Sequence, residues 1–477
     1  MNLNPSDCYQ ALKARDSRFD GHFFVGVTST GIYCRPICPA RTPAQARCLF
    51  FPSAAQAESQ GFRPCLRCRP ELAPGHAPVD AASRIAKLAL GKIRAGALSE
   101  GQSLEQLAQE LGLSSRQLRR SVQQELGASP VELAQTQRLL LAKQLLTETH
   151  LPVTEVAYAS GFSSLRRFNA LFKERYGLNP SSLRRKSVQA PDGELALTLG
   201  YRPPLAWQPL LDFLQGHALL GAEQVDGPVY RRTLRLGEHQ GWIEVRPKDA
   251  GRLQLRLAQT LLPVLPLVLG KVRALFDLDA NALAIDEHLA TDPRLAASVA
   301  ERPGVRVPGC TDLFELAWRT ILGQQVSVAA ATRIAARTVE ALGEPIATPF
   351  PALQRLAPTA QTFLRTEQET LGKLGWIRSR SAAVSGLAAA CLDGSFSLSY
   401  GDDPERAITA LVKFPGIGPW TAGYIAMRGL GWSDGWPPGD AILKKHLAND
   451  GSPDPRWRPW SAYAAMRVWY PVERKDS

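Results

Sequence analysis

Hydrophobic and polar residues follow two different periods along the C-terminal half of this chain. The segments WIEVRP (242–247) and LQLRLA (253–258) alternate apolar and polar residues, which is the period of a β-strand. Further on, alanine-rich runs such as the one over 313–342 repeat their apolar positions with the helical period. The pattern predicts a small α+β subdomain over 195–300, followed by an all-α domain over 301–477.

The helical period also marks the region before these elements, where one motif occurs twice. The segment SLEQLAQELGLSSRQLRRSV (103–122) predicts a helix, a tight turn at a glycine and a second helix with Ser114 or Ser115 as its N-cap. The segment VTEVAYASGFSSLRRFNALFKERYG (153–177) repeats this design after about 49 residues. We therefore predict two helix-turn-helix motifs in an all-α domain over 81–186.

The basic residues are concentrated in this same region. The 477 residues include 56 Lys and Arg against 44 Asp and Glu, a net charge of +12, and residues 81–190 hold 16 of the basic and 8 of the acidic residues. A basic helix-turn-helix region is typical of DNA binding, because the second helix enters the major groove. An αα-corner without DNA binding is the alternative for each single motif. The side chains expected to face DNA are Arg116, Gln117, Arg119 and Arg120 in the first motif, and Arg166, Arg167 and Asn169 in the second.

The overall composition is that of a globular protein, with 45% hydrophobic and 21% charged residues, which excludes wholesale disorder and a fibrous repeat. Linker-like stretches at 71–80 and 186–194 lack apolar periodicity. The most apolar run, over 261–270, is too short for a membrane span and contains two prolines. Since the N-terminal residues lack the basic and apolar segments of a secretion signal, we expect a cytoplasmic protein without a membrane partner.

Six of the eight cysteines lie within the first 68 residues, in a pattern that predicts a metal site. Cys34 and Cys38 form one close pair, and Cys65 and Cys68 form a second pair after 26 intervening residues. Two such pairs suit Zn²⁺, because each pair can bind the same ion while the loop between them folds around it. A zinc ion that only stabilises a segment with a small core is one interpretation, and a zinc site that carries chemistry is the other.

The segments FVGVTSTGIYCRPICPAR (24–41) and GFRPCLRCRP (61–70) closely resemble the N-terminal domain of Ada-type adaptive-response regulators. This resemblance implies a small zinc-bound α/β head over 1–75, in which the four cysteines hold one Zn²⁺. It also implies that Cys34 irreversibly accepts a methyl group from a methylphosphotriester in DNA. The basic region resembles the AraC-type DNA-binding domain, which also follows the zinc domain in Ada-type regulators.

A second candidate site lies in the segment LVKFPGIGPWTAGYIAMRGLG. Pro415, Gly416, Ile417 and Gly418 stand between two apolar helical stretches and fit a helix-hairpin-helix. In that motif, glycines let backbone N–H groups approach a DNA phosphate at the N-terminus of the next helix. A simple turn between two helices is the alternative interpretation.

Asp440 follows Gly418 by 22 residues, in WPPGDAILKKHL, and taken alone it predicts a helix N-cap. Together with LTLGYRPPLAW, LFDLDAN, ILGQQVSV and RPWSAYAAMRVWY, the hairpin and this aspartate resemble the helix-hairpin-helix DNA glycosylase superfamily. The likeness is strongest to its AlkA-type 3-methyladenine glycosylase II branch and covers Leu195–Tyr470. It implies a small antiparallel-sheet subdomain before an all-α helix-hairpin-helix glycosylase domain.

The same resemblance assigns roles to individual residues. It implies that Asp440 is the catalytic carboxylate and that Trp420, Tyr424 and Trp460 form an aromatic cleft for the base and sugar. It also implies that the Gln325 side chain fills the space left by a flipped base. Trp420 stands where bifunctional relatives carry a Schiff-base lysine, so hydrolysis without strand cleavage is expected. No cysteine follows Cys391, so no iron–sulfur cluster is expected.

The patterns predict a multidomain α+β protein, and the resemblances imply that it belongs to the DNA alkylation response. We expect a monofunctional DNA glycosylase for alkylated bases such as 3-methyladenine, fused to a methyl-accepting zinc site and a transcription regulator. The expected partners are double-stranded DNA, both alkylated and as a promoter operator, and RNA polymerase, and the expected state is a monomer. A DNA-binding regulator whose two catalytic activities have decayed is the alternative.

Overall fold

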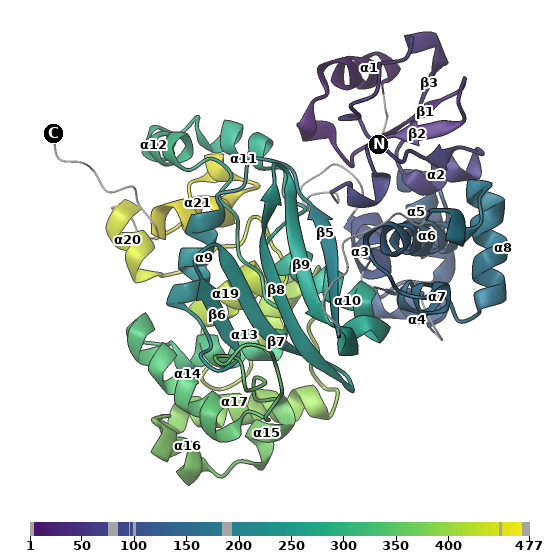
Figure 1. Ribbon diagram of the computed structural model, residues 1–477. Coiled ribbons are helices and arrows are strands. Elements are labelled where there is room, and N and C mark those ends of the chain that lie inside the picture. Colours follow the sequence, from purple (N-terminus) through teal and green to yellow (C-terminus); the bar gives the residue numbers. More distant parts are fainter. Residues whose placement is uncertain are drawn as a thin grey trace. The chain divides into compact units, whose positions relative to one another are not determined.

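The computed structural model describes residues 4–74, 84–94, 96–98, 102–183, 193–447 and 451–469. Most of the two predicted linkers, at 75–80 and 186–192, and the last part of the predicted C-terminal domain, at 470–477, lie outside these ranges. The chain divides into two compact units. The first unit holds residues 1–203, 248–273 and 278–281, and the second unit holds 204–247, 274–277 and 282–477. The described residues are rich in helices and form two small sheets (Figure 1).

The N-terminal part of the first unit is built on a four-stranded sheet with the order β3-β1-β2-β4. Its elements are α1 (Pro5–Ala14), β1 (Phe24–Val27), β2 (Ile32–Cys34), β3 (Cys48–Phe51), α2 (Ala54–Ser59) and β4 (Arg63–Pro64). β1 runs antiparallel to β2 and β3, whereas β2 and β4 are parallel, with Tyr33 opposite Pro64. Aromatic side chains of β1, β2 and β3 pack with alanines of α2 into a core. Because β2 and β4 are parallel neighbours, the segments that follow them leave the sheet at the same edge.

The described helices that follow in the first unit contain both predicted helix-turn-helix motifs. They are α3 (Arg84–Arg94), α4 (Leu104–Glu110), α5 (Ser115–Leu126), α6 (Pro130–Glu148), α7 (Val153–Ala159) and α8 (Leu165–Tyr176). Ser114 caps α5 and Ser164 caps α8, each by accepting a hydrogen bond from a backbone N–H in the first helical turn. The turns before these caps contain Gly112 (φ 68°) and Gly161 (φ 88°), in the left-handed region that glycine adopts without steric cost. The long helix α6 connects the two motifs.

The alternating segments are strands, as their period predicts, in a five-stranded sheet with the order β5-β9-β8-β7-β6 (Figure 1). The strands are β5 (Glu194–Gly200), β6 (Glu223–Asp226), β7 (Val229–Leu236), β8 (His239–Asp249) and β9 (Arg252–Ala258), with α9 (Trp207–Gly216) between β5 and β6. β5 pairs antiparallel with β9, and β7 pairs antiparallel with both β6 and β8. In β9, the side chains of Leu253, Leu255 and Leu257 are buried, because they share one face of the strand.

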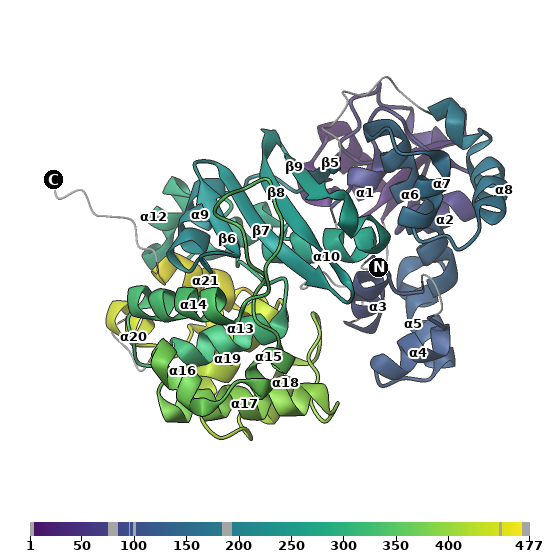
Figure 2. The same ribbon diagram turned by 60° about the horizontal axis from the view of Figure 1, so that its bottom comes forward.

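The remaining described elements of the chain are helical. They are α10 (Leu265–Leu275), α11 (Ala282–Leu289), α12 (Pro293–Glu301), α13 (Leu313–Leu322), α14 (Val328–Leu342), α15 (Ala360–Arg365), α16 (Gln368–Leu374), α17 (Arg378–Leu392), α18 (Pro404–Leu411), α19 (Pro419–Gly429), α20 (Ala441–Leu447) and α21 (Ser461–Trp469). Figure 2 shows α13 and α15–α19 grouped together, around a core that includes Trp318, Phe363 and Trp376. Across the described residues, no helix combines the length and the apolar character that a membrane crossing requires.

A buried ion network joins β6 and β7 to α13 in the second unit. Arg232 donates hydrogen bonds to Glu223 (3.0 Å) and Glu315 (2.7 Å). Arg319 donates to the same two carboxylates, at 3.2 and 2.8 Å. Burial raises the pKa of Glu223, but the charges of Arg319 and Arg232 outweigh burial and hold this pKa at about 2. The network therefore fixes α13, whose C-terminal end leads directly into the turn that contains Gln325.

Candidate functional site

The four predicted cysteine ligands lie together at one edge of the N-terminal sheet. Cys34 is the last residue of β2, and Cys65 follows β4 and donates its backbone N–H to the Tyr33 carbonyl over 3.0 Å. Cys38 and Cys68 lie in the turns that follow these two positions. The four Sγ atoms are all within 4.8 Å of one another, and none of them forms a disulfide. The parallel pairing of β2 and β4 thus brings two distant cysteine pairs to one point.

The spacing of these sulfur atoms fits Zn²⁺. Four sulfurs at about 2.3 Å from a tetrahedral centre are about 3.8 Å apart, which lies within the observed spread. Hydrogen bonding with Cys34 lowers the pKa of the Cys38 thiol to about 7, whereas hydrogen bonding with Cys38 raises the pKa of the Cys34 thiol. A divalent cation is what allows all four sulfurs to be thiolates together. The donor set therefore matches a closed four-cysteine zinc site.

The four sulfurs differ in their surroundings. Backbone N–H groups of Arg35 and Arg67 donate to the Sγ atoms of Cys68 and Cys65, each over 3.4 Å. The Arg35 guanidinium pairs with the Asp20 carboxylate and donates to the Cys68 carbonyl over 3.1 Å, which fixes the turn after β2. Three of the cysteines are 6–7% exposed, whereas Cys34 is only partly buried. Cys34 is therefore the most exposed residue of the cluster.

Asp440 lies directly before α20 and is 8% exposed. Its Oδ1 accepts hydrogen bonds from the backbone N–H groups of Ile442 (3.0 Å) and Leu443 (2.9 Å), so the residue is a helix N-cap. The carboxylate also accepts the indole N–H of Trp420 at Oδ2 over 2.9 Å and that of Trp469 at Oδ1 over 3.1 Å. The N-cap role thus accounts for Oδ1, whereas Oδ2 is held by Trp420.

Aromatic rings from two helices adjoin this carboxylate. Trp420 and Tyr424, on successive turns of α19, stack with ring centroids 5.3 Å apart and planes inclined by 15°. Trp469, the last residue of α21, lies against Tyr424 with centroids 6.0 Å apart. Arg428 donates to the Tyr424 hydroxyl over 3.0 Å and to two backbone carbonyls of the segment before α13. The Arg428 contacts therefore hold Tyr424 in the orientation that stacks on Trp420.

Trp460, the third aromatic residue predicted for this cleft, has different neighbours. Its ring packs edge-to-face on His288, with centroids 4.7 Å apart, and its buried Nε1 has no acceptor within the described part of the chain. In that same part, Trp460 makes neither a hydrogen bond nor a ring contact with Asp440, Trp420 or Tyr424. The structure brings the other tryptophan of the same sequence segment beside Asp440.

The predicted hairpin residues connect α18 to α19. Gly416 has φ 86°, and a Cβ added there would lie 2.9 Å from the Ala383 Cβ, so glycine is required. Pro415, Gly416 and Gly418 are exposed. Ile417 is only 3% exposed and packs into the helical core. The Ile417 side chain therefore anchors the hairpin from inside, while the backbone of its neighbours lies at the surface.

Gln325 lies in the turn between α13 and α14, where its side chain is exposed. Its φ of 53° is in the left-handed region, which is uncommon for a residue other than glycine. The preceding residue, Gln324, donates its side-chain amide to the Gly416 carbonyl (2.9 Å) and the Thr421 hydroxyl (2.8 Å). The turn and the hairpin, which the sequence predicts as separate DNA contacts, are thus bonded to each other.

The seven residues predicted to face DNA in the helix-turn-helix motifs are all exposed. They are Arg116, Gln117, Arg119 and Arg120 of α5, and Arg166, Arg167 and Asn169 of α8. Gln117 has a second role, because its Oε1 accepts the backbone N–H of Ser114 over 3.0 Å and completes a capping box. Leu118 and Phe168 are fully buried on the opposite faces of these helices. Both second helices therefore present a polar, mainly basic face to solvent.

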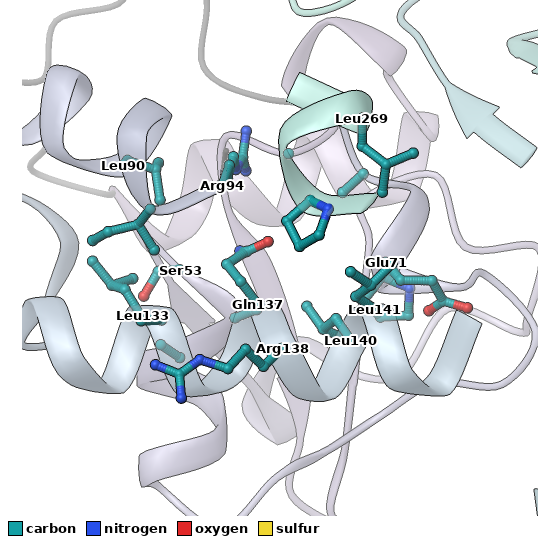
Figure 3. A pocket seen from close by; sticks show the side chains of 18 of the residues that line it. Ser53, Glu71, Leu90, Arg94, Leu133, Gln137, Arg138, Leu140, Leu141 and Leu269 are labelled. Carbon is teal, nitrogen blue, oxygen red and sulfur yellow. The ribbon is translucent and has the colours of Figure 1, made fainter. Parts of the chain in front are cut away.

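A cavity of about 140 Å³ lies elsewhere in the first unit. Figure 3 shows Leu133 and Gln137 of α6 on one side of it, and Leu90, Arg94 and Leu269 from α3 and α10 around it. None of the four clustered cysteines lines this cavity. It is therefore separate from the candidate metal site.

Comparisons with known proteins bear on all parts of the chain. Three family models match it, namely the metal binding domain of Ada at residues 7–71, a helix-turn-helix domain at 107–186 and the AlkA N-terminal domain at 196–312. A probable bifunctional transcriptional activator/DNA repair enzyme AlkA of Mycobacterium tuberculosis (strain ATCC 25618 / H37Rv) is 37% identical, over 98% of this chain and 96% of its own length. The chain belongs to this family of bifunctional transcriptional activator/DNA repair enzymes.

Two further relatives of this family member each match a part of it. DNA-3-methyladenine glycosylase 2 of Escherichia coli (strain K12) is 37% identical over 57% of this chain and 96% of its own length. The bifunctional transcriptional activator/DNA repair enzyme AdaA of Bacillus subtilis (strain 168) is 31% identical over 38% of this chain and 82% of its own length. The family member therefore combines sequence that occurs in separate proteins elsewhere.

Two residues at the candidate sites of this family member were not predicted from its sequence. Trp469 lies in the segment RPWSAYAAMRVWY, but the segment contains two tryptophans and its helical period does not say which one faces Asp440. Gln324 precedes Gln325 in ILGQQVSV, and only the left-handed turn places the two adjacent glutamines in different directions. In both cases the sequence predicted the segment that lies at the site, but packing between distant elements determines which residue of that segment makes the contact.

Proposed function

We propose that this family member repairs DNA alkylation damage and regulates the response to it. Its C-terminal part is a monofunctional DNA glycosylase that hydrolyses the N-glycosidic bond of alkylated bases such as 3-methyladenine. Its N-terminal part is a zinc-thiolate methyl acceptor and transcription regulator. The observation that carries the glycosylase proposal is the buried carboxylate of Asp440, held by two indole N–H groups beside stacked aromatic rings.

In the proposed reaction, Asp440 acts on the sugar. The bond between C1′ and the base nitrogen breaks and its electron pair leaves with the base, so positive charge develops on the sugar, where a carboxylate stabilises it. Trp420 and Trp469 hold the two oxygens in place, so the carboxylate needs little reorganisation as that charge appears. Water then adds to C1′ and gives up a proton to Asp440. The products are the free base and an abasic site.

The aromatic rings suit a cationic base. Trp420, Tyr424 and Trp469 present electron-rich faces, and N-alkylated purines carry positive charge that such faces attract. The exposed Gln325 side chain fills the space left by the flipped nucleotide, and the hairpin backbone binds a neighbouring phosphate. Because position 420 is a tryptophan and offers no amine, the reaction ends at hydrolysis and leaves the strand intact.

Base release from methylated duplex DNA tests this proposal. The wild-type protein is expected to release 3-methyladenine and to leave abasic sites without strand cleavage or a borohydride-trapped adduct. Asp440→Asn is expected to slow release by at least about 100-fold, since the carboxylate charge is lost. Release at the wild-type rate by this variant would overturn the role of Asp440. No release by the wild type would favour a regulator with decayed activities.

Cys34 is the proposed methyl acceptor, because it is the most exposed residue of the cluster. Zn²⁺, when bound by the four cysteines, keeps the sulfurs deprotonated near neutral pH. The Cys34 Sγ forms a bond to the methyl carbon of a methylphosphotriester, and the bond from that carbon to the phosphate oxygen breaks. The electron pair stays on the phosphate, which becomes an ordinary diester. Loss of one thiolate charge lowers the repulsion between the cluster and DNA phosphates, which provides the regulatory switch.

Mass spectrometry on the peptide that contains Cys34 tests this step. Incubation with DNA that carries methylphosphotriesters is expected to add one methyl group to Cys34 and to increase affinity for operator DNA. Cys34→Ala is expected to abolish both changes, whereas Cys48→Ala, a buried cysteine outside the cluster, is expected to keep them. Methylation elsewhere in the Cys34→Ala protein would identify a different acceptor.

The two helix-turn-helix motifs are proposed to bind operator DNA through the exposed faces of α5 and α8. Replacing Arg119, which is exposed and lies on α5, by Ala is expected to weaken binding and to lower the salt dependence by about one charge if the residue contacts a phosphate. RNA polymerase as a partner and a monomeric state are further parts of this proposal. Sedimentation of the free protein and transcription from an operator template check them.

A further inference from the structure

The turn between α13 and α14 is bonded to the hairpin through a single side chain. The Gln324 amide nitrogen donates to the Gly416 carbonyl over 2.9 Å and to the Thr421 hydroxyl over 2.8 Å. Gly416 belongs to the hairpin and Thr421 to the first turn of α19, so the two acceptors lie on either side of Gly418. The backbone carbonyl of Gln324 in turn accepts from the guanidinium of Arg380, which is 8% exposed at the start of α17.

The chemistry of this contact is specific to an amide. A primary amide nitrogen carries two N–H groups, and Gln324 has one acceptor for each of them. A glutamate of the same size has acceptors only, so it cannot donate to the Gly416 carbonyl. Shortening the side chain to alanine removes both bonds and leaves that carbonyl without this donor.

The residue that follows this contact has an unfavourable backbone conformation. Gln325 has φ 53°, and such a conformation persists only where the surroundings fix it. Gln324, its neighbour on the N-terminal side, is fixed at its side chain by the hairpin and α19 and at its backbone carbonyl by α17. Among the described residues, none of the hydrogen bonds of Asp440 involves Gln324 or Arg380, so neither residue bonds directly to that carboxylate.

We infer that Gln324 is a positioning residue for base excision. Gln324 sets the distance between the Gln325 side chain and the hairpin. The hairpin can then bind a phosphate while Gln325 fills the space left by the flipped base of the same duplex. The inference rests on the proposed glycosylase function, because it assigns DNA contacts to both Gln325 and the hairpin. It adds that these contacts act as one rigid element.

A double-mutant cycle on the full-length protein tests this coupling, with release of 3-methyladenine from methylated duplex DNA as the readout. Gln324→Ala is expected to lower kcat/KM about tenfold, mostly through KM, because two hydrogen bonds that orient the turn are lost. In a Gln325→Ala background, the same substitution is expected to change kcat/KM by less than about twofold, because there is no longer a side chain to position. A full tenfold loss in that background would overturn the inference.

The matched control is Gln368→Ala, which loses hydrogen bonds to Ser381 and Ser385 in the same helical region. It is expected to release base at the wild-type rate, so a comparable loss there would show that any lost glutamine contact impairs the domain. Thr421→Val removes one acceptor only and provides the same cycle if Gln324→Ala folds poorly. The two proposals can be contradicted separately. If the wild-type protein releases no base, the glycosylase function is contradicted. If it releases base but the effects of the substitutions at Gln324 and Gln325 are independent, only the coupling is contradicted.

Discussion

The indole Nε1 of Trp469 lies 3.1 Å from Oδ1 of Asp440, the same oxygen that caps α20. Trp420 holds the other oxygen of that carboxylate from α19, over 2.9 Å. Three helices, α19, α20 and α21, thus converge on one side chain. The position of the carboxylate therefore depends on the packing of all three helices, although its role as a cap needs only α20.

Two substitutions of Asp440 separate its structural role from its proposed catalytic role. Asparagine keeps an oxygen that accepts the N–H groups of Ile442 and Leu443, so Asp440→Asn is expected to keep the cap, although its amide nitrogen cannot accept the indole N–H of Trp420 and that hydrogen bond is lost. Asp440→Ala loses the cap, and its free energy of unfolding is expected to fall by about 1 kcal/mol. Both variants are expected to lose base release. If only the alanine variant lost base release, the loss would follow stability, and Asp440 would act only as a helix N-cap.

Trp469 and Trp460 provide a paired test of the aromatic cleft. Trp469→Phe keeps a ring against Tyr424 but removes the hydrogen bond to Asp440, so single-turnover base release is expected to slow about tenfold. Trp460→Phe removes an N–H group that has no acceptor among the described residues, and it is expected to have little effect on the rate. The reverse order of effects would support the predicted role of Trp460 in the cleft over that of Trp469.

The sequence could predict those features that depend on short-range spacing. Only a few neighbouring residues determine each of these features, and their types can be read from the sequence. They are the two cysteine pairs, the serine caps of α5 and α8, and the glycine turn at Gly416. Likewise, the alternation in LQLRLA predicts a strand, because one face of β9 is buried. Local rules are sufficient for such elements.

Short-range sequence patterns could not predict contacts between elements that are distant in the chain. Glu223, Arg232 and Glu315 are charged residues of the kind that usually face solvent, yet they are at most 5% exposed, and Arg232 donates hydrogen bonds to both carboxylates. The bond between Trp469 and Asp440 spans 29 residues, and that between Gln324 and Thr421 spans 97. Such pairs become visible only when the helices are packed, since each partner alone has an ordinary sequence context.

Glu58 gives the first unit a predictable dependence on pH. This carboxyl of α2 is 4% exposed and accepts hydrogen bonds from Tyr33 (3.0 Å) and Thr136 (2.9 Å). Burial raises its pKa from 4.5 to about 7, although both hydrogen bonds lower it. Because the folded pKa exceeds the unfolded one, its contribution to stability is fully present below about pH 4.5 and is lost as the pH rises through about 7.

Urea unfolding of the wild type and Glu58→Gln at several pH values measures this contribution. The wild-type free energy of unfolding is expected to fall between about pH 5 and about pH 8, and the variant is expected to show a shallower fall, because its amide does not titrate. Thr147→Ala, which removes a hydroxyl that bonds only to backbone carbonyls of α6, is a control expected to keep the wild-type slope. Equal slopes for wild type and Glu58→Gln would contradict the assignment.

The buried ion network of the second unit is expected to contribute to stability. Glu315→Gln removes one of two carboxylates that face Arg232 and Arg319, and the free energy of unfolding is expected to fall by about 3 kcal/mol or more, because a buried cation loses its partner. The matched control is Glu369→Gln, which breaks an exposed pair with Lys373 and is expected to change stability little.

The same network has a defined acid limit. The folded pKa of Glu223 is about 2, below its ordinary value of 4.5, so its contribution is present above about pH 4.5 and is lost as the pH falls towards about 2. Denaturant unfolding at decreasing pH is expected to show this loss in the wild type. Since α13 ends at the turn that carries Gln324, Glu315→Gln is also expected to lower base release at temperatures where the protein is still folded. A destabilised variant with unchanged kcat/KM would show that the network supports the fold without setting the position of that turn.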